Sequence, residues 1–353
     1  MRALSWVRSR PKTLASAAIV VIGTVTVATL AVAYDGLSTT KVDLNDSGVW
    51  LTKSSSLLVG HFNHSSTVLD GGLRAADENY DVLQDETAVL VVDQGSKTLT
   101  AVDPARVALT DSTTIPAGAK VALGDRTAAI LDRASGDLWV TGTSSISGFD
   151  VKAADPTAEL GKHADVVVAQ DGTVFALSTD RGEVVTVTVD AQGDPLKASS
   201  SSVGEIGASD PASITAVGST PVVLDPAAGV VTTPGGFRTE ISDQGLGSMK
   251  DVVLQQASAS ASAVALSGDG ELLQVPLDGS EPTATRSGGG EGTPAAPVFL
   301  NGCTYAAWGG SARFLRDCAG SADDVKAEIP GAQQSSHLAD AIRDTDSQLA
   351  GGA

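Results

Sequence analysis

The stretch AVLVVDQGSKTLTAVDP at residues 88–104 has the composition of a β-hairpin. An apolar run rich in valine is followed by a polar turn that contains Gly95, and a second run then mixes apolar residues with threonine. β-Branched residues favour strands, whereas Gly and Asp favour tight turns. The stretch therefore predicts two antiparallel strands joined by a short turn.

Related stretches recur along the chain, each with an apolar run, a polar turn containing Gly or Asn, and a second strand-like run. They lie at 56–70, 128–140, 164–177, 221–233, 263–275 and 297–308. Their turn residues Asn63, Asp93, Asp132, Asp171, Asp225, Asp269 and Asn301 are 30, 39, 39, 54, 44 and 32 residues apart, about 40 on average. Such a period is typical of propeller blades, which are four-stranded sheets.

We therefore expect an all-β fold, a β-propeller of about seven blades over residues 48–320, although six or eight blades also fit. The alternative is one or two β-sandwiches, whose turns recur every 8–12 residues. Residues 49–51 are candidates for a strand that closes the ring against the last blade. The Ser- and Gly-rich stretches 197–213 and 287–297 are expected to be surface loops.

The N-terminal segment, residues 1–34, has the pattern of a membrane anchor. Residues 14–34 contain no charge and no proline, and as a helix they would span about 32 Å, enough to cross a hydrocarbon core. Four cations precede them and Asp35 follows, which favours a cytoplasmic N-terminus of residues 1–13, a single-pass cell-membrane protein and an extracytoplasmic body. The alternative is a signal peptide cleaved after Ala33, because Ala31-Val32-Ala33 fits a cleavage site and the product would be secreted. Residues 35–47 would be a linker.

The charge of the chain excludes one class of function. Of the 353 residues 42% are hydrophobic, which is enough for a buried core, and the net charge is −19. Residues 1–34 carry +4 and the rest carry −23. Because the residues after 34 are so acidic, they repel phosphate groups, and we expect no nucleic-acid partner.

Two cysteines, Cys303 and Cys318, flank a stretch whose Gly309-Gly310 turn would fold two strands together. This would bring the two side chains opposite each other, and in an oxidising compartment a disulfide would form. The alternatives are two reduced thiols or half of a metal site, but no histidine is near in sequence.

Other candidate sites are weak. His61 and His64 are spaced so that both imidazoles could hold one metal, but a polar hairpin turn explains the pair better. Residues 43–48, DLNDSG, begin like a calcium loop, but Ser54 stands where the bidentate acid is required. No Ser-nucleophile elbow or zinc-protease motif is present. We therefore expect no catalytic residues, no cofactor and no metal.

The chain resembles the N-terminal part of large actinobacterial cell-envelope proteins. The resemblance covers roughly residues 1–330 and depends on the basic start, the apolar segment, the VVD-type hairpins and a late segment with Gly302-Cys303, Ala307-Trp308 and Arg316-Asp317-Cys318. In that family the propeller is followed by immunoglobulin-like or fibronectin type III-like domains. Here residues 321–353 would be a tail or the stub of such a domain, because no strand pattern follows Pro330.

These observations predict a membrane-anchored, extracytoplasmic β-propeller that binds or scaffolds components of the cell envelope. The resemblance implies that it is the N-terminal part of a longer surface protein, with an envelope protein or a cell-wall glycan as partner. The alternative function is a propeller-type hydrolase or lactonase with a metal in the central channel, which would require several Asp, Glu, Asn or His side chains at one end of that channel.

Overall fold

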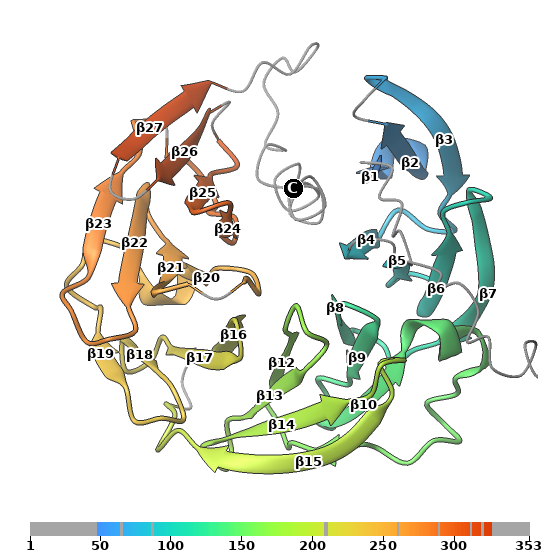
Figure 1. Ribbon diagram of the computed structural model, residues 1–353, viewed down its shortest axis with the longest axis horizontal. Coiled ribbons are helices and arrows are strands. Elements are labelled where there is room, and N and C mark those ends of the chain that lie inside the picture. The colour runs from blue at the N-terminus through green and yellow to red at the C-terminus, as the bar shows by residue number, and fades with distance from the viewer. Residues whose placement is uncertain are drawn as a thin grey trace, which may run out of the picture. The chain divides into compact units, whose positions relative to one another are not determined.

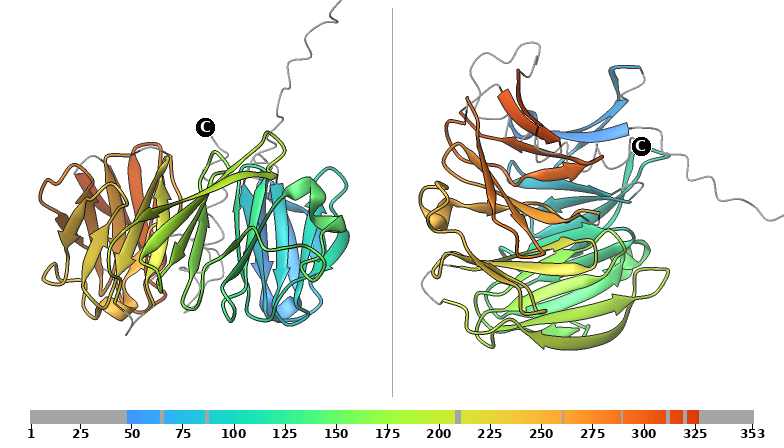
Figure 2. Two further views of the ribbon diagram at one scale, coloured as in Figure 1. Left: turned by 90° about the horizontal axis from the view of Figure 1, so that it is seen from below. Right: turned by 60° about the vertical axis from the view of Figure 1, so that its left-hand side comes forward.

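A computed structural model describes residues 48–326, except 64–65, 86–87, 208–210, 260, 289, 311–312 and 319–320. All of these belong to one compact unit, which begins at Asn45. They form seven antiparallel sheets, one of three strands and six of four, which follow one another around a central channel (Figures 1 and 2). This is a β-propeller, and the prediction of an all-β fold with about seven blades is confirmed.

The blades follow the chain in order. Blades 1 to 3 consist of β1 (Gly48–Lys53), β2 (Leu58–Asn63) and β3 (Val68–Arg74); β4 (Tyr80–Asp85), β5 (Ala88–Asp93), β6 (Thr98–Asp103) and β7 (Ala108–Thr114); and β8 (Lys120–Gly124), β9 (Thr127–Leu131), β10 (Asp137–Gly142) and β11 (Ala158–Glu159). Blades 4 and 5 consist of β12 (Asp165–Val168), β13 (Val174–Ser178), β14 (Glu183–Val189) and β15 (Pro195–Ser202); and β16 (Ser213–Val217), β17 (Thr220–Asp225), β18 (Val230–Thr232) and β19 (Arg238–Glu240). Blades 6 and 7 consist of β20 (Val253–Leu254), β21 (Ala263–Ser267), β22 (Glu271–Pro276) and β23 (Thr283–Arg286); and β24 (Val298–Leu300), β25 (Cys303–Ala307), β26 (Arg313–Cys318) and β27 (Ser321–Lys326). Short 3-10 helices lie at Ser54–Ser56, Thr143–Gly148 and Met249–Asp251.

One turn recurs from blade to blade and aligns their strands. In blades 2 to 6 the residue just before the third strand has a positive φ, and its carbonyl accepts a hydrogen bond from the N–H of the residue just after the fourth strand. The pairs are Lys97 with Ile115, Gly136 with Leu160, Gly182 with Val203, Gly229 with Ile241 and Gly270 with Ser287, at 2.8–2.9 Å. This hydrogen bond joins the start of the third strand to the end of the fourth strand in each of these blades.

Blade 1 has the same turn, and the turn shows which positions of a blade its three described strands occupy. Leu57 has a φ of 52° and accepts the N–H of Ala75 at 2.9 Å, where Leu57 precedes β2 and Ala75 follows β3. β2 and β3 therefore correspond to the third and fourth strands of the other blades, and β1 to the second. Burial agrees, since β1 and β2 are mostly covered whereas β3 is exposed like the outer strands β7 and β15. Among the described residues, blade 1 has no inner strand.

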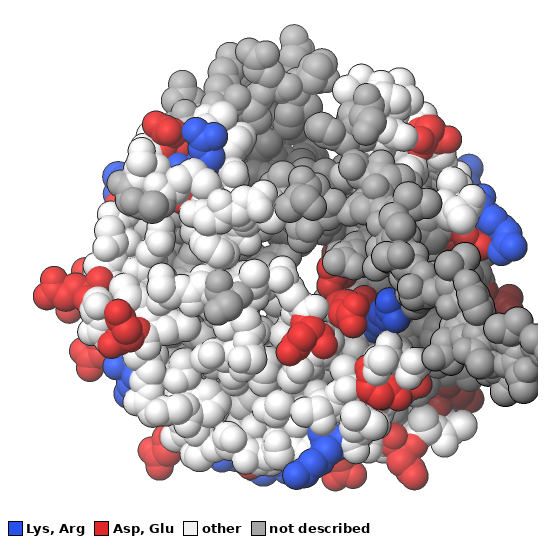
Figure 3. All heavy atoms as spheres, in the orientation of Figure 1, with Lys and Arg blue, Asp and Glu red and all other residues white. Residues whose placement is uncertain are grey.

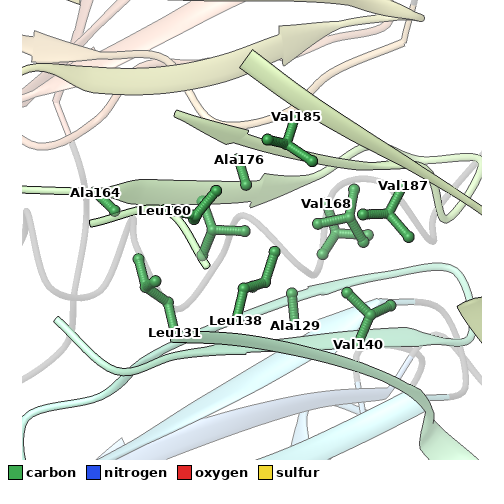
Figure 4. Packing of buried hydrophobic residues seen from close by; sticks show 12 residues of the cluster. Ala129, Leu131, Leu138, Val140, Leu160, Ala164, Val168, Ala176, Val185 and Val187 are labelled. Carbon is green, nitrogen blue, oxygen red and sulfur yellow. The ribbon is translucent and has the colours of Figure 1, made fainter. Parts of the chain in front are cut away.

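The hydrophobic core is divided among the junctions between consecutive blades. Six clusters of buried residues join blades 1 and 2, 2 and 3, 3 and 4, 4 and 5, 5 and 6, and 6 and 7. Figure 4 shows the junction of blades 3 and 4, where Leu131, Leu138 and Val140 face Val168, Val185 and Val187. Within the described part of the chain, no such cluster joins blade 7 to blade 1.

The structure corrects three details of the sequence prediction. Residues 49–51 pair with β2 in blade 1, and none of the described strands of blade 7 pairs with them. Residues 197–202 are not a loop but belong to β15, whose side chains are all exposed, so its strand has no apolar face that the sequence could reveal. The last strand, β27, lies beyond residue 320.

The predicted period mixes three kinds of turn. Asp93 and Asp269 stand between second and third strands, but Asp171 and Asn301 stand between first and second, and Asn63 between third and fourth. Equivalent turns are marked by the left-handed residues Leu57, Lys97, Gly136, Gly182, Gly229 and Gly270, which are 39–47 residues apart. The true repeat is therefore more regular than the predicted steps, which range from 30 to 54.

No helix among the described residues has the length and hydrophobicity that crossing a membrane requires. The predicted anchor, residues 14–34, lies outside the described part of the chain, as do residues 1–13, 35–47 and 327–353.

Candidate functional site

The candidate site is the central channel. Its cavity, with a volume of about 420 Å³, is lined by the inner strands of blades 2 to 7. On the face shown in Figure 3, acidic and basic side chains lie beside a hollow at the middle. Apolar residues such as Val167, Leu123 and Phe299 provide much of the rest of the wall. A pocket of this size is in the range that small ligands occupy.

One polar group of the channel is an ion pair between blades 3 and 4. Lys120, at the start of β8, places its Nζ 2.6 Å from Oδ1 of Asp165, at the start of β12. The two side chains are 29% and 11% exposed. The other carboxylate oxygen, Oδ2, accepts the backbone N–H of Ile214 in blade 5 at 3.1 Å. One carboxylate thus holds together the inner strands of three consecutive blades.

Other polar side chains of the channel also bind backbone. Asp85 Oδ2 accepts the N–H of Asp125 in blade 3 at 2.6 Å. Gln255 is buried; its Oε1 accepts the N–H of Ala265 at 2.7 Å and its Nε2 donates to Ser258 Oγ at 2.8 Å. Lys120, Asp165, Asp85 and Gln255 therefore position strands, and none of these contacts orients a nucleophile toward a general base.

The sequence did not identify Lys120 or Asp165. They are 45 residues apart, and each stands alone at the start of an apolar strand, so no spacing connects them. The only sequence signal for the pair is that two of the otherwise apolar inner strands begin with a charged residue. That signal indicates exposure at a strand end as readily as it indicates an ion pair.

We expect that Asp165→Ala lowers the free energy of unfolding by about 1–3 kcal/mol, because it leaves a half-buried ammonium and the Ile214 N–H without their acceptor. Asp165→Asn, which keeps an acceptor oxygen for Ile214, should cost less. The matched control is Arg106→Ala: Arg106 pairs with Asp103 at 2.7 Å but its side chain is 82% exposed, so its loss should cost less than about 1 kcal/mol. Urea unfolding followed by far-UV circular dichroism measures all three. Equal losses for Asp165→Ala and Arg106→Ala would contradict the bridging role.

The alternative function would place a metal ion in the channel, among the residues that the structure describes. No three His, Cys, Asp or Glu side chains there are grouped so that they could hold a metal ion. Of the predicted calcium-like stretch 43–48, only Gly48 is described, and it lies in β1. The metal-dependent hydrolase or lactonase alternative thus gains no support from these residues, and the expectation that the protein is not an enzyme stays a prediction.

His61 contacts Trp50 and Asp70, and His64 lies outside the described residues, so the structure does not bring the two histidines together. His61 is buried in β2, where its ring lies 5.0 Å from that of Trp50 between centroids. Its Nδ1 is 2.5 Å from Oδ1 of Asp70, whose Oδ2 accepts a hydrogen bond from Asn63 Nδ2 at 3.1 Å. These contacts tie β2 to β3 at the bulge where the register of the two strands shifts.

The hydrogen bond from His61, followed by that from Asn63, holds the pKa of Asp70 below its ordinary value of 3.8. A lowered pKa in the folded state means that the ionised carboxylate stabilises the fold above pH 3.8, and that this contribution is lost as the pH falls through the lower, folded-state pKa. We expect the melting temperature of Asp70→Asn to lie below that of the wild type at pH 6 and to converge with it toward pH 2.5. A difference that stays constant over this range would contradict the prediction.

Cys303 and Cys318 form a disulfide. They are opposite each other in the pairing of β25 with β26, with Cα atoms 4.2 Å apart. The predicted disulfide is therefore present, and the reduced and metal-bound alternatives do not apply. It joins the two central strands of blade 7 at the ends remote from their connecting turn.

No protein-family model matches this sequence, and no curated protein matches it either. Solved structures do resemble the fold. The dihydro-heme d1 dehydrogenase NirN, in complex with DHE, superposes with a TM-score of 0.58 at 11% identity, over 84% of this chain and 66% of that one. This chain therefore spans just under two thirds of the length of that protein.

AztD from Citrobacter koseri superposes with a TM-score of 0.51 at 8% identity, over 81% of this chain and 85% of that one. Its apo form gives 0.50 at 10% identity, over 83% and 85%. One of these similar proteins is named as a dehydrogenase and the other is not named as an enzyme. At such low identities the similarity shows the fold alone, so the function has to be argued from the site.

Proposed function

We propose that the propeller is an extracytoplasmic binding or scaffold module of the cell envelope, anchored to the cell membrane through residues 14–34, and that it forms the N-terminal part of a longer multidomain surface protein. Its partner is an envelope protein or a cell-wall glycan. The observation that carries this proposal is the role of four polar side chains of the channel, since Asp165, Lys120, Asp85 and Gln255 bind other blades or backbone. Such a channel favours a rigid support for outer surfaces over a reaction centre.

Two further observations support an extracytoplasmic location. The disulfide of blade 7 belongs to a class of bond that persists in oxidising compartments and is rare in the cytosol. The +4 charge of residues 1–34 against −23 for the rest fits a cytoplasmic leader and an exported body.

The location is tested by fractionation. The full chain with a C-terminal epitope tag should sediment with membranes after a carbonate wash, and protease added to cells stripped of their wall should digest it. The matched control is the same chain with residues 1–34 replaced by a cleavable signal peptide, which should be recovered in the medium. Recovery of the full chain in the carbonate supernatant would contradict the anchor.

The binding role is tested by formaldehyde crosslinking of intact cells and by sedimentation of the purified propeller with purified cell wall. We expect at least one envelope protein or the wall itself to be recovered with the anchored chain. The control is a tagged cytoplasmic protein of similar charge. If neither crosslinking nor sedimentation exceeds this control, the binding role is wrong, whereas the location would still stand.

A further inference from the structure

The turn between β24 and β25 consists of Asn301 and Gly302. Leu300 and Cys303 on either side of it are paired, so the turn has two residues, whose φ angles are 50° and 76°. Two-residue turns with a positive φ at both positions are of type I′, for which Asn-Gly is a favoured sequence. The conformation thus explains the choice of these residues, but together they also have a chemical reactivity of their own.

The side chain of an asparagine can react with the backbone nitrogen of the next residue. That nitrogen loses its proton and attacks the side-chain carbon Cγ, and the new C–N bond closes a succinimide ring while the side-chain nitrogen takes a proton from water and leaves as ammonia. Water then opens the ring at one of its two carbonyl groups, which gives aspartate or isoaspartate. A glycine at the next position has no Cβ and leaves the nitrogen unhindered. Of the four asparagines of the chain, only Asn301 is followed by glycine.

Both reacting groups are open to water. Asn301 and Gly302 are exposed, and a Cβ placed on Gly302 would meet no atom within 4 Å outside the adjacent residues. In the hydrogen bonds of the described residues, neither the side-chain amide of Asn301 nor the N–H of Gly302 takes part. Neither group therefore has to give up a protein partner before it reacts.

The closed turn nevertheless holds the reacting atoms apart. A φ of 50° places Asn301 in the left-handed region, where ψ is about +30 to +60°. At such a ψ the nitrogen of Gly302 and the Cβ of Asn301 lie on opposite sides of the bond between Cα and the carbonyl carbon, whereas the ring requires them on the same side. The reaction therefore requires the turn to open.

Two features of blade 7 control this opening. β24 has three residues and lies at the end of its sheet, so it separates from its neighbour more readily than a central strand does. Against this, Cys303 directly follows the turn and is bonded to Cys318 of β26, which holds the start of β25 in place. We propose that Asn301 is a site of spontaneous deamidation, and that the disulfide slows the reaction because it keeps the turn closed.

The products alter blade 7 beside the channel. Both add a carboxylate, and isoaspartate also lengthens the main chain by one carbon atom. The longer connection no longer fits the two-residue turn that pairs Leu300 with Cys303. Because Leu300 lines the channel, the modification changes the channel wall as well as the strand pairing. The proposal is independent of the binding role and of the anchor.

Incubation of the purified full chain at mildly alkaline pH tests the proposal. Peptide mass analysis should find the mass gain from replacement of NH₂ by OH at Asn301 well before Asn79, which precedes the bulky, buried Tyr80. In the double variant Cys303→Ser/Cys318→Ser, the reaction at Asn301 should be several-fold faster than in the wild type, whereas Asn79 should not change. Circular dichroism confirms beforehand that both proteins are folded.

The same chains unfolded in urea give the rate without the turn. Asn301 should react faster there than in either folded protein, and at the same rate in the wild type as in the double variant. Gly302→Ala should slow the reaction in urea, because its Cβ hinders the attacking nitrogen. This variant is measured in the unfolded chain because a positive φ strains alanine in the folded one.

The outcomes bear on separate parts of the proposal. No mass gain at Asn301 in either folded protein, over a time in which the unfolded chains react fully, would overturn the modification site. Equal gains at Asn301 and Asn79 would overturn its selectivity. If the folded wild type reacts as fast as the unfolded chain, the closed turn does not control the reaction. If the two folded proteins react equally fast, the disulfide has no part in it.

Discussion

Trp308→Ala is expected to lower the free energy of unfolding by about 3–5 kcal/mol. The Trp308 side chain directly follows β25 and is 0% exposed. It fills the junction of blades 6 and 7 together with Ala265, Leu272 and Leu315. Its Nε1–H donates to the carbonyl of Gly268 at 2.7 Å, in the turn of the neighbouring blade. The alanine variant would therefore lose a large apolar contact, leave a cavity and remove the donor of a buried hydrogen bond.

Two companion variants separate these contributions. Trp308→Phe keeps most of the apolar volume but has no donor for Gly268, so its loss should be intermediate. Leu69→Ala removes an apolar side chain that is 55% exposed on β3, and it should change the free energy by less than about 0.5 kcal/mol. Urea unfolding followed by far-UV circular dichroism gives the three values. If Trp308→Ala costs no more than Leu69→Ala, the junction of blades 6 and 7 does not contribute to stability as we infer.

The architecture could be predicted from the sequence because each blade repeats its own local signals. The apolar second strands and their polar turns follow short-range rules, and their recurrence at a blade-length period indicates a ring. The place of each strand within its blade was harder to predict. Asp171 and Asp225 both follow an apolar run, although one turn joins first and second strands and the other joins second and third. What distinguishes the second kind of turn is the hydrogen bond that the residue before the third strand accepts from the residue after the fourth. Leu57 and Lys97 take the left-handed conformation at that position without the glycine that would have signalled it.

The site shows where sequence reasoning ends. The cysteines were found because a turn lies midway between them and both belong to one hairpin. The Lys120–Asp165 pair joins two blades and depends on how those blades are rotated about the channel, which no local pattern encodes. That blade 1 has only three strands among the described residues was missed for the same reason, since the positions of its strands are defined only by comparison with the other blades.

The second large effect is expected from the disulfide. We expect the double variant Cys303→Ser/Cys318→Ser to lose about 3 kcal/mol of stability, because the bond closes a loop with a sequence separation of 15 residues and so restricts the unfolded chain. Unfolding in urea with and without dithiothreitol measures this. The wild type in reductant should match the double variant, and reductant should not affect the double variant itself.

The loss should also be localised, because blade 7 packs against a described hydrophobic cluster on one side only. On the other side of blade 7, Tyr305 of β25 and Phe314 of β26 are only half-buried. Blades 2 to 6 are stabilised by packing on both faces, whereas blade 7 depends on the covalent bond in addition to packing on one face. Hydrogen exchange should therefore accelerate in residues 303–318 of the double variant far more than in β9 and β13, which lie in a fully packed junction. Uniform acceleration over all blades would show that the ring unfolds as a whole and that the bond does not protect blade 7 in particular. Unchanged stability in the double variant would contradict both expectations.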